Sequence, residues 1–560
     1  MTELLTALAV IFIVAGPFVL LANRLQLSAV PALIVSGLIA GLFIEEDLEL
    51  ALARLGIALL VFTFAVKIHT ESVRTVVTDP EIVSITQAVI VGALGFAGGV
   101  LVGLTPEQSL YVGIAAALSS TIVGTALFQS PRKDLVRDRL SASINSVQDL
   151  LAIFVLLILG AGAFAADPIA TQLGYGVMLL VAAVVVNRYC FDWIARLAKG
   201  SDESMLIGII ALLIVFLAIA EYVGISIVVG AFAAGIAIRD DPVAYSNVLN
   251  GLESVKDFFA AIFFVTVGAL VTIPTLEALV VALLLFVLTA LVKPAIIIAL
   301  LILNGYDRRS ATLVGFDLDH VGELGIIVAI EALVLGILAT TVFDGIILAA
   351  AVTMILSSFT WYYDEELYRF LVSHGLLGRA RHTVDDWNTV PADLEDHVVI
   401  VGYGRQGRRL VTFCEEVDHP YVVVENDPAL LDDLRADCTH YVLGDAIEAE
   451  TWQAARLTDA RLVVSTVTTK PLTDHLLSFT DAVDVIVRTE DVTAAPAYID
   501  RGAVYVSIAD LLAADHLAEQ IEALIDGRYD PAQLRERSER ELEIHSEPAR
   551  PSTGESTDMF

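Results

Sequence analysis

The chain has 560 residues, a mean hydropathy of +0.75 and a formal net charge of −34 at pH 7. This acidic excess excludes nucleic acid as an expected partner, because binding nucleic acid needs a basic face. It predicts a solvated acidic surface like that of proteins from halophiles. The alternative is that the chain is simply an acidic bacterial protein. The three cysteines have neither metal-ligand spacing nor a disulfide framework, as expected on a reducing cytosolic side.

Hydropathy divides the chain into two parts. Long apolar runs continue as far as residue 362, and the remainder is polar and acidic. A spanning helix needs about 20 apolar residues, so the first part has room for many spans. We predict a multi-span α-helical membrane domain over 1–362, a linker over 363–395 and an α/β Rossmann-type domain over 396–527. The acidic tail over 528–560 is expected to contain a short helix and otherwise to be disordered.

The membrane region is predicted to contain about thirteen transmembrane helices. Residues 3–22 could pass for a signal peptide, but no basic segment precedes them and many spans follow. Lys and Arg concentrate in alternate loops, such as 132–139 and 188–199, which the positive-inside rule places in the cytoplasm. We therefore expect the N-terminus outside and the C-terminus inside a plasma membrane. The predicted spans are 3–22, 28–44, 50–69, 82–104, 107–129, 139–165, 170–190, 204–221, 224–239, 256–272, 275–303, 310–338 and 341–362.

Two predicted spans carry polar residues at membrane depth. Residues 119–131 are rich in Ser, Thr and Gly. Residues 315–330 carry Asp317, Asp319, His320 and Glu323 before they become apolar again. Irregular backbone inside a membrane is tolerated where it is buried in protein or lines a wet cavity. Two broken helices in separate halves of a chain are typical of a transporter built from inverted repeats, although small residues could simply allow close helix packing.

A carboxylate, Asp149, is predicted to lie within a span beside Gln148. An ionised carboxylate at the centre of a membrane helix costs about 3 kcal/mol or more. It could pair with a buried base, or it could bind either a cation or a proton in competition, which is the physical basis of exchange. Gln148 adds a neutral carbonyl oxygen. The hydroxyls of Ser119, Ser120 and Thr121 are further oxygen donors suited to a monovalent cation.

Lys293 is the other isolated charge within a predicted span. It could pair with Asp149 while the site is empty, or it could extend towards the membrane interface. Pro294 follows directly, so a local kink could aim the lysine. The sequence leaves these alternatives open.

Seven stretches, in their order along the chain, resemble the monovalent cation:proton antiporter family 2. The resemblance is greatest to its Kef-type branch, in which a Gln-Asp pair replaces the Asn-Asp or Asp-Asp pair of electrogenic relatives. It implies a homodimer formed through both domains, a scaffold with a moving core domain, alternating access and electroneutral exchange. The stretches are "LGIALLVFTFAV" (55–66), "SSTIVGTALFQ" (119–129), "VQDLLAIFVLLIL" (147–159), "VGAFAAGIAI" (229–238), "FFAAIFFVTVGALV" (258–271), "LVKPAIII" (291–298) and "GELGIIVA" (322–329).

The resemblance implies a secondary active transporter and not an enzyme, so no catalytic residues are expected. Asp149 would bind the monovalent cation and the proton, and the other candidates for this site are Gln148, Thr121, Ser120, Lys293 and Glu323. Kef-type proteins usually carry Gly-Leu-Glu and Ser-Gln-Gly-Gly-Glu where this chain has residues 65–67 and 319–323. These departures concern cation choice and regulation, so Na⁺ stays open beside the favoured K⁺.

The polar part contains a glycine-rich turn in "HVVIVGYGRQGRRLVTF", with Gly402, Gly404 and Gly407. Such a turn between a strand and a helix lets a pyrophosphate approach the helix N-terminus. Glu425 ends the next strand-like run, where an acid can bind ribose hydroxyls, and Asp445 follows the third. The repeating pattern predicts a Rossmann-type parallel sheet, and a sheet that binds no ligand is the alternative.

This part resembles the RCK or Trk-N domain, which regulates potassium channels and transporters. The resemblance implies NAD(H) or an adenine nucleotide (AMP or ATP) as a regulatory ligand, held by the five residues just named. No redox role is expected, because no substrate domain follows.

We therefore expect an antiporter that exchanges K⁺ or Na⁺ for H⁺ under nucleotide control. An RCK-gated potassium channel or channel-like efflux system is the main alternative, but the sequence has no selectivity filter such as T-V-G-Y-G. A membrane redox enzyme would need a haem, flavin or quinone site. His69 and His320 are too few and too distant to suggest haem ligation.

Overall fold

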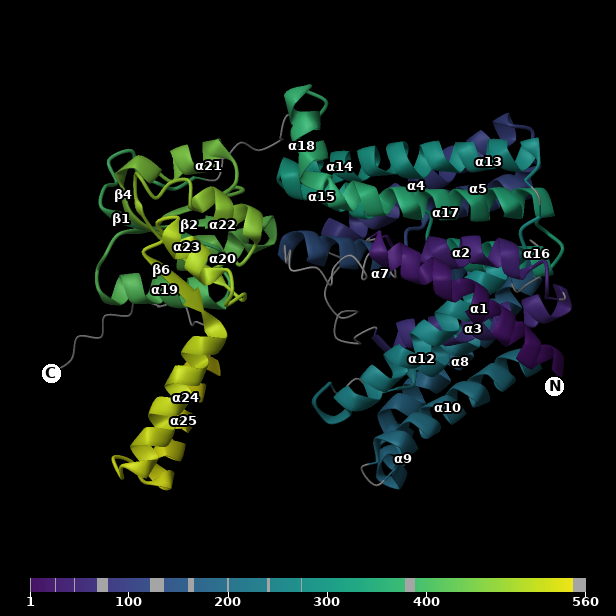
Figure 1. Ribbon diagram of the computed structural model, residues 1–560, viewed down its shortest axis with the longest axis horizontal. Coiled ribbons are helices and arrows are strands. Elements are labelled where there is room, and N and C mark those ends of the chain that lie inside the picture. Colours follow the sequence, from purple (N-terminus) through teal and green to yellow (C-terminus); the bar gives the residue numbers. More distant parts are fainter. Residues whose placement is uncertain are drawn as a thin grey trace. The chain divides into compact units, whose positions relative to one another are not determined.

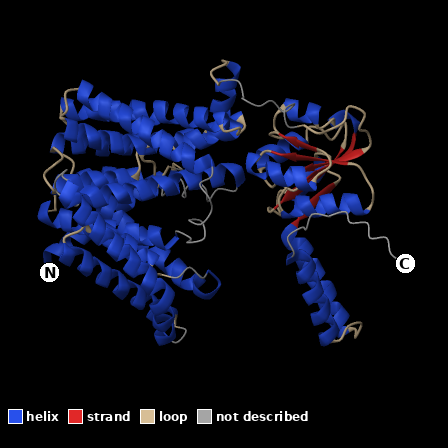
Figure 2. Cartoon of the chain, turned by 180° about the vertical axis from the view of Figure 1, so that it is seen from behind, coloured by secondary structure: helices blue, strands red, loops and turns tan. Residues whose placement is uncertain are grey.

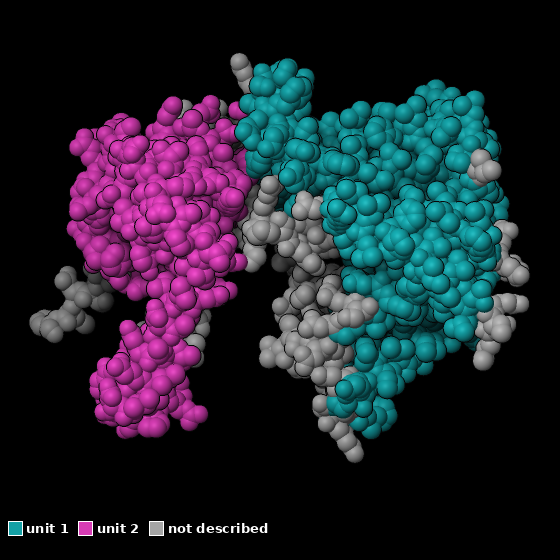
Figure 3. Space-filling model, in the orientation of Figure 1, with its two compact units in different colours: residues 1–129, 137–304, 310–378 teal, residues 130–136, 305–309, 379–560 magenta. Residues whose placement is uncertain are grey.

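The chain is known from a computed structural model that describes residues 2–25, 27–44, 46–67, 79–120, 135–159, 166–198, 201–238, 242–272, 274–377 and 388–546. It divides into two compact units, coloured separately in Figure 3. The first comprises residues 1–129, 137–304 and 310–378, and the second comprises 130–136, 305–309 and 379–560. Within the described residues, every strand belongs to the second unit (Figure 2).

The first unit is an assembly of helices. Eight helices of the described part are long and apolar enough to cross a membrane, and two shorter ones are also apolar. The total of about thirteen spans stays a prediction. The helices of this unit are α1 (Thr2–Arg24), α2 (Ala29–Ala40), α3 (Glu46–Lys67), α4 (Asp79–Leu101), α5 (Pro106–Ala117), α7 (Leu135–Leu159), α8 (Ala166–Val185), the π turn η2 (Val186–Cys190), α9 (Phe191–Ala198), α10 (Asp202–Val223), α11 (Ile227–Ile236), α12 (Pro242–Ala269), α13 (Leu276–Val287), the π turn η3 (Leu288–Val292), α14 (Lys293–Leu303), α15 (Arg308–Asp317), α16 (Glu323–Val334), α17 (Thr340–Tyr362) and α18 (Asp364–Ser373).

Small residues let these helices approach closely. A Cβ added to Gly268 of α12 would lie 2.0 Å from the carbonyl oxygen of Ile34 on α2. A Cβ added to Gly37 would lie 2.2 Å from the carbonyl oxygen of Val265. Lipid is as apolar as a protein core, so close backbone packing is what favours helix association there. The glycines therefore set the spacing of α2 and α12.

A π turn interrupts the long helical segment 276–303. The turn η3 ends at Val292, directly before Lys293 and Pro294. Proline has no N–H to donate to the preceding turn and its ring clashes with the carbonyl four residues earlier. A π turn changes the helical register at such a point. It brings Lys293 to a completely buried position.

The second unit contains a six-stranded parallel sheet with helices between the strands (Figure 1). The strand order is β3-β2-β1-β4-β5-β6, so the chain reverses its direction of winding between β1 and β4. The elements are β1 (His397–Val401), α19 (Arg405–Glu416), β2 (Tyr421–Glu425), α20 (Leu431–Asp437), β3 (Tyr441–Leu443), α21 (Ala449–Ala454), β4 (Ala460–Ser465), α22 (Lys470–Leu476), β5 (Asp484–Thr489), α23 (Ala495–Asp500), β6 (Tyr505–Ile508), α24 (Ala509–Ile525) and α25 (Pro531–Ser546).

The central strands are buried on both faces, which explains their unbroken Val and Ile runs. Val399 and Val401 of β1 pack in one apolar cluster, and Ile400 between them packs in another on the opposite face. The predicted α/β fold of this part is confirmed. The structure also contains α18 within the predicted linker and α25 within the predicted tail.

Candidate functional site

Two short non-helical segments cross inside the first unit, and together we call them the crossover. Residues 118–120 follow α5, and residues 318–322 join α15 to α16. The Gly322 N–H donates a hydrogen bond to the carbonyl of Leu118 at 3.1 Å. A Cβ on Gly322 would lie 2.2 Å from the carbonyl oxygen of Ser119, so this backbone approach requires glycine. Residues 121–134, with Thr121, lie outside the described part of the chain.

Gln148 connects α7 to the crossover. Its Oε1 accepts a hydrogen bond from the Ser119 N–H at 2.6 Å, and its Nε2 donates to Oε1 of Gln87 on α4 at 3.0 Å. Gln87 in turn donates to the carbonyl of Ala117 at 3.0 Å. Both glutamines are fully buried, so their polar groups must find partners within the protein, and these bonds supply them. Gln148 thereby fixes the crossover beside the next residue of its own helix, Asp149, which is also buried.

Lys293 links the two segments of the crossover. Its Nζ donates to the carbonyl of His320 at 2.7 Å and to the carbonyl of Leu118 at 3.3 Å. Asp319 is close enough to act on its charge electrostatically. Carbonyls freed where a helix unwinds need new donors inside a membrane protein, and an ammonium supplies three. The structure therefore places Lys293 in the interior, where it does not extend towards the membrane interface.

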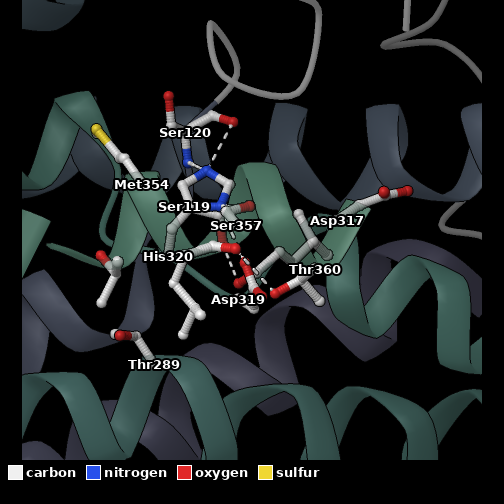
Figure 4. A network of polar contacts seen from close by, with 12 residues as sticks. Ser119, Ser120, Thr289, Asp317, Asp319, His320, Met354, Ser357 and Thr360 are labelled. Atoms are coloured by element: carbon white, nitrogen blue, oxygen red, sulfur yellow. Dashed lines mark hydrogen bonds and ion pairs between the residues drawn. The ribbon is translucent and has the colours of Figure 1, made fainter. Parts of the chain in front are cut away.

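The side chain of His320 connects the other crossover segment, residues 118–120, to α17 (Figure 4). Its Nε2 accepts from the Ser120 N–H at 3.1 Å, and its Nδ1 is 3.1 Å from Oγ of Ser357. Oδ1 of Asp319 is 3.6 Å from Nδ1. A neutral imidazole with its proton on Nδ1 satisfies both hydrogen bonds. The sequence places this histidine in a broken span, which is a signal of a special role, but it does not predict the contacts with Ser120 and Ser357.

The structure brings most of the predicted ion-site residues to one region. Ser120 is in the crossover and Glu323 directly follows it as the first residue of α16, and both are buried. The partial positive charge of a helix N-terminus favours a carboxylate at that position. Gln148 and Lys293 contact the crossover directly. Gln87 was not among the candidates: it is a polar residue within a predicted span, which is a signal, but the sequence does not show which helix it contacts.

The three glycines of the turn after β1 have different roles. Gly402 has a φ of +94°, in the region that glycine adopts most easily. A Cβ on Gly407 would lie 2.0 Å from the carbonyl oxygen of Gly402, so this glycine lets α19 pack against the turn. A Cβ on Gly404 would meet no atom within 4 Å. That open backbone at the start of α19 is where a phosphate could approach.

The two predicted acids lie at the carboxyl ends of neighbouring strands. Glu425 ends β2, and its carboxylate accepts from the backbone N–H groups of Tyr403 (2.6 Å), Asn426 (2.8 Å) and Asp427 (3.0 Å). Burial nevertheless raises the pKa of Glu425 above its ordinary value. Asp445 follows β3 and is also buried. Both acids therefore lie at the sheet edge where nucleotides bind in Rossmann-type folds.

Both parts of the chain are similar to known proteins. Residues 8–362 match the family described as sodium/hydrogen exchanger, transmembrane, and residues 398–508 match the TrkA-N domain. YbaL of Escherichia coli is 26% identical over 492 residues, which cover 83% of this chain and 87% of YbaL. KefB of Alkalimonas amylolytica is 26% identical over 505 residues, covering 84% of this chain and 74% of KefB. KefC of Shigella flexneri is 25% identical over 505 residues, covering 85% of this chain and 78% of KefC.

The two matches account for both units. The first includes the crossover, α7 and α14, and the second includes the glycine-rich turn and the acids that follow β2 and β3. The order of the two matched regions is the one expected from the sequence. The chain belongs to the sodium/hydrogen exchanger family and is a Kef-type cation/proton antiporter with a TrkA-N domain.

Proposed function

We propose that this antiporter exchanges K⁺, in preference to Na⁺, for H⁺ across the plasma membrane, with its TrkA-N domain in the cytoplasm. The preference for K⁺ is supported by the description of KefC as a glutathione-regulated potassium-efflux system protein. The orientation is supported by the distribution of Lys and Arg among the loops. The observation that carries the proposal is the buried Gln148–Asp149 pair beside the crossover.

Asp149 is the proposed ion-binding acid. Its single carboxylate holds either a proton or a monovalent cation, because binding one removes the charge that attracts the other. Ser120, Thr121 and Glu323 are proposed to supply further oxygen atoms as the core moves between its two access states. Gln148 carries no charge, so the pair has one titratable group, which favours electroneutral one-for-one exchange.

Lys293 is proposed to hold the crossover closed by bonding a carbonyl on each segment. A buried ammonium also lowers the electrostatic potential energy of a nearby ionised acid. Lys293 is also proposed to pair with Asp149 while the site is empty, which would favour release of the proton from that acid.

The TrkA-N domain is proposed to bind NAD(H) or an adenine nucleotide as a regulator. The phosphates would lie against the turn formed by Gly402, Gly404 and Gly407. Glu425 would bind the ribose hydroxyls, and Asp445 would lie beside the ligand at the same carboxyl edge of the sheet. The ligand is proposed to act by binding alone, with no redox reaction.

We also propose a homodimer. The helix α24 exposes Leu517, Ile521 and Leu524, which lie on one face at helical spacing. The helix extends from the sheet of its own unit (Figure 1). A second copy could cover this apolar face with its own α24, since an isologous contact is self-complementary.

The Asp149→Asn variant tests the proposed exchange. The amide keeps the size of the side chain and removes its charge, so K⁺-driven proton movement should fall to the level of empty liposomes. The purified protein in proteoliposomes with a pH-sensitive dye measures this, with K⁺ and Na⁺ tested in turn.

Glu277→Gln is the matched control. Glu277 is exposed in the first turn of α13, at the opposite end from the turn η3 that precedes Lys293, so its loss should leave the flux intact. Exchange by Asp149→Asn at the wild-type rate would disprove the role of Asp149. Faster flux with Na⁺ than with K⁺ would disprove the cation preference.

A further inference from the structure

A buried ion cluster joins three helices of the first unit. Arg137 donates through Nε and Nη2 to the two carboxylate oxygens of Asp317, with Nε 2.8 Å from Oδ2. Its Nη1 donates to Oδ2 of Asp364 at 2.6 Å. Ser141 adds a hydrogen bond to Oδ2 of Asp317 at 2.9 Å. All four residues are buried, so these hydrogen bonds are shielded from water.

Each helix of the cluster leads to a different part of the molecule. Arg137 is on α7, about three turns before Asp149. Asp317 is the last residue of α15, directly before the crossover segment 318–322. Asp364 is the first residue of α18, the helix that follows the last long apolar helix. In the sequence, α18 is the last helix of the first unit before the TrkA-N domain, whose match begins at residue 398.

A guanidinium in such a place must stay paired. Removing one partner of a buried ion pair leaves an uncompensated charge, which is far more costly than the intact pair. The guanidinium of arginine is planar, and its N–H donors hold two carboxylates in a fixed arrangement. A movement of one carboxylate therefore changes the hydrogen bonds of the other. A displacement of α18 must therefore either break the bond between Arg137 and Asp364, or move Arg137 and so change how it bonds Asp317.

We propose that Arg137 is the positioning residue through which the TrkA-N domain controls exchange. Nucleotide binding displaces α18, Asp364 carries the displacement to Arg137, and Arg137 passes it to α7 and to the end of α15. This inference rests on the proposed function. The neighbouring acid Glu366 cannot have this role, because it is exposed and its ion pair with Arg369 at 3.5 Å stays within α18.

The test compares Asp364→Asn with Glu366→Gln in the full chain. K⁺-driven proton flux is measured in proteoliposomes with and without NAD⁺, NADH, AMP or ATP on the side of the TrkA-N domain. At least one nucleotide should change the wild-type flux about fivefold or more. Asp364→Asn should lose most of that response and still bind the same nucleotide by calorimetry. Glu366→Gln, which removes the same charge from the same turn, should respond as wild type.

Arg137→Lys is the second variant, because lysine keeps the charge but cannot bond two carboxylates in the arginine geometry. It should lose the response in the same way, and gel filtration checks that both variants are folded. A wild-type response in Asp364→Asn or Arg137→Lys would overturn the inference. So would a wild-type flux that no nucleotide alters. A wild type without cation–proton exchange would instead overturn the proposed function.

Discussion

At the scale of single residues, the site depends on groups that make two contacts at once. Gln148 bonds the crossover with its oxygen and Gln87 with its nitrogen. Lys293 bonds one carbonyl on each unwound segment. The sequence identified Asp149, Gln148 and Lys293 because polar side chains are rare in apolar spans. It could not identify Gln87 or the tie between Arg137 and Asp364, because these depend on which helices become neighbours.

Gly322→Ala should disrupt the crossover. The new Cβ would lie 2.2 Å from the carbonyl oxygen of Ser119, and neither backbone segment can withdraw without losing its hydrogen bonds. Overpacking of this kind costs about 1–3 kcal/mol or more. We expect a lower thermal unfolding midpoint in detergent and at least roughly a tenfold loss of exchange, in line with about 1.4 kcal/mol per tenfold.

Gly325→Ala is the matched control for that change. Gly325 lies on α16 three residues later, and its added Cβ would be 3.4 Å from Cα of Ala115, an ordinary contact. Alanine also favours a helix more than glycine does. A loss of stability in Gly325→Ala as large as that in Gly322→Ala would show that the crossover is not the cause.

At the scale of elements, the glycine-rich turn was predictable and the broken spans were only partly so. The turn between β1 and α19 is a local structure, so the spacing of its glycines is enough to predict its backbone conformation. The π turn before Lys293 was expected only as a kink at Pro294. Its exact register depends on packing, because helices on every side must accept the shifted side chains.

Two alanine substitutions should separate binding from folding in this turn. Gly404→Ala has room for its Cβ, so the domain should unfold at the wild-type temperature. The methyl group would occupy the proposed approach of the phosphates, and nucleotide affinity should fall roughly tenfold, about 1.4 kcal/mol. Calorimetric titration and thermal unfolding of the full chain measure the two effects.

Gly407→Ala should behave in the opposite way. Its Cβ would lie 2.0 Å from the carbonyl oxygen of Gly402, so α19 would be pushed away from the turn. The domain should unfold at a lower temperature, and weaker binding would follow from that loss. Equal unfolding temperatures for Gly404→Ala and Gly407→Ala would contradict the different roles of the two glycines.

At the scale of the whole molecule, exposed apolar side chains differ in meaning between the two units. In the first unit they are expected to face lipid. In the second unit the face of α24 formed by Leu517, Ile521 and Leu524 is expected to meet water unless a partner covers it. The strong negative charge of the chain opposes non-specific association, so the proposed contact between copies is expected at such an apolar face.

Leu517→Asp should weaken the proposed dimer. Leu517 is 60% exposed, so aspartate costs little in the isolated chain but would be buried in the contact. Light scattering after gel filtration should show a shift towards the monomer. Val492→Asp, at a 50% exposed position between β5 and α23, should leave the dimer unchanged. A monomeric wild type, or dimers in both variants, would contradict this role of α24.

Local features of the sequence were enough to predict the two-part architecture, the Rossmann-type sheet, the Gln148–Asp149 pair and the glycine-rich turn with the two acids that follow it. These follow from hydropathy, strand patterning and short motifs, which are properties of neighbouring residues. Three contacts are visible in the folded chain alone: Gln148 bonds Ser119, Lys293 bonds both crossover segments, and Arg137 joins α7, α15 and α18. Those contacts join residues that are far apart in the chain, and packing selects them because each buried polar group must find a partner in the absence of water.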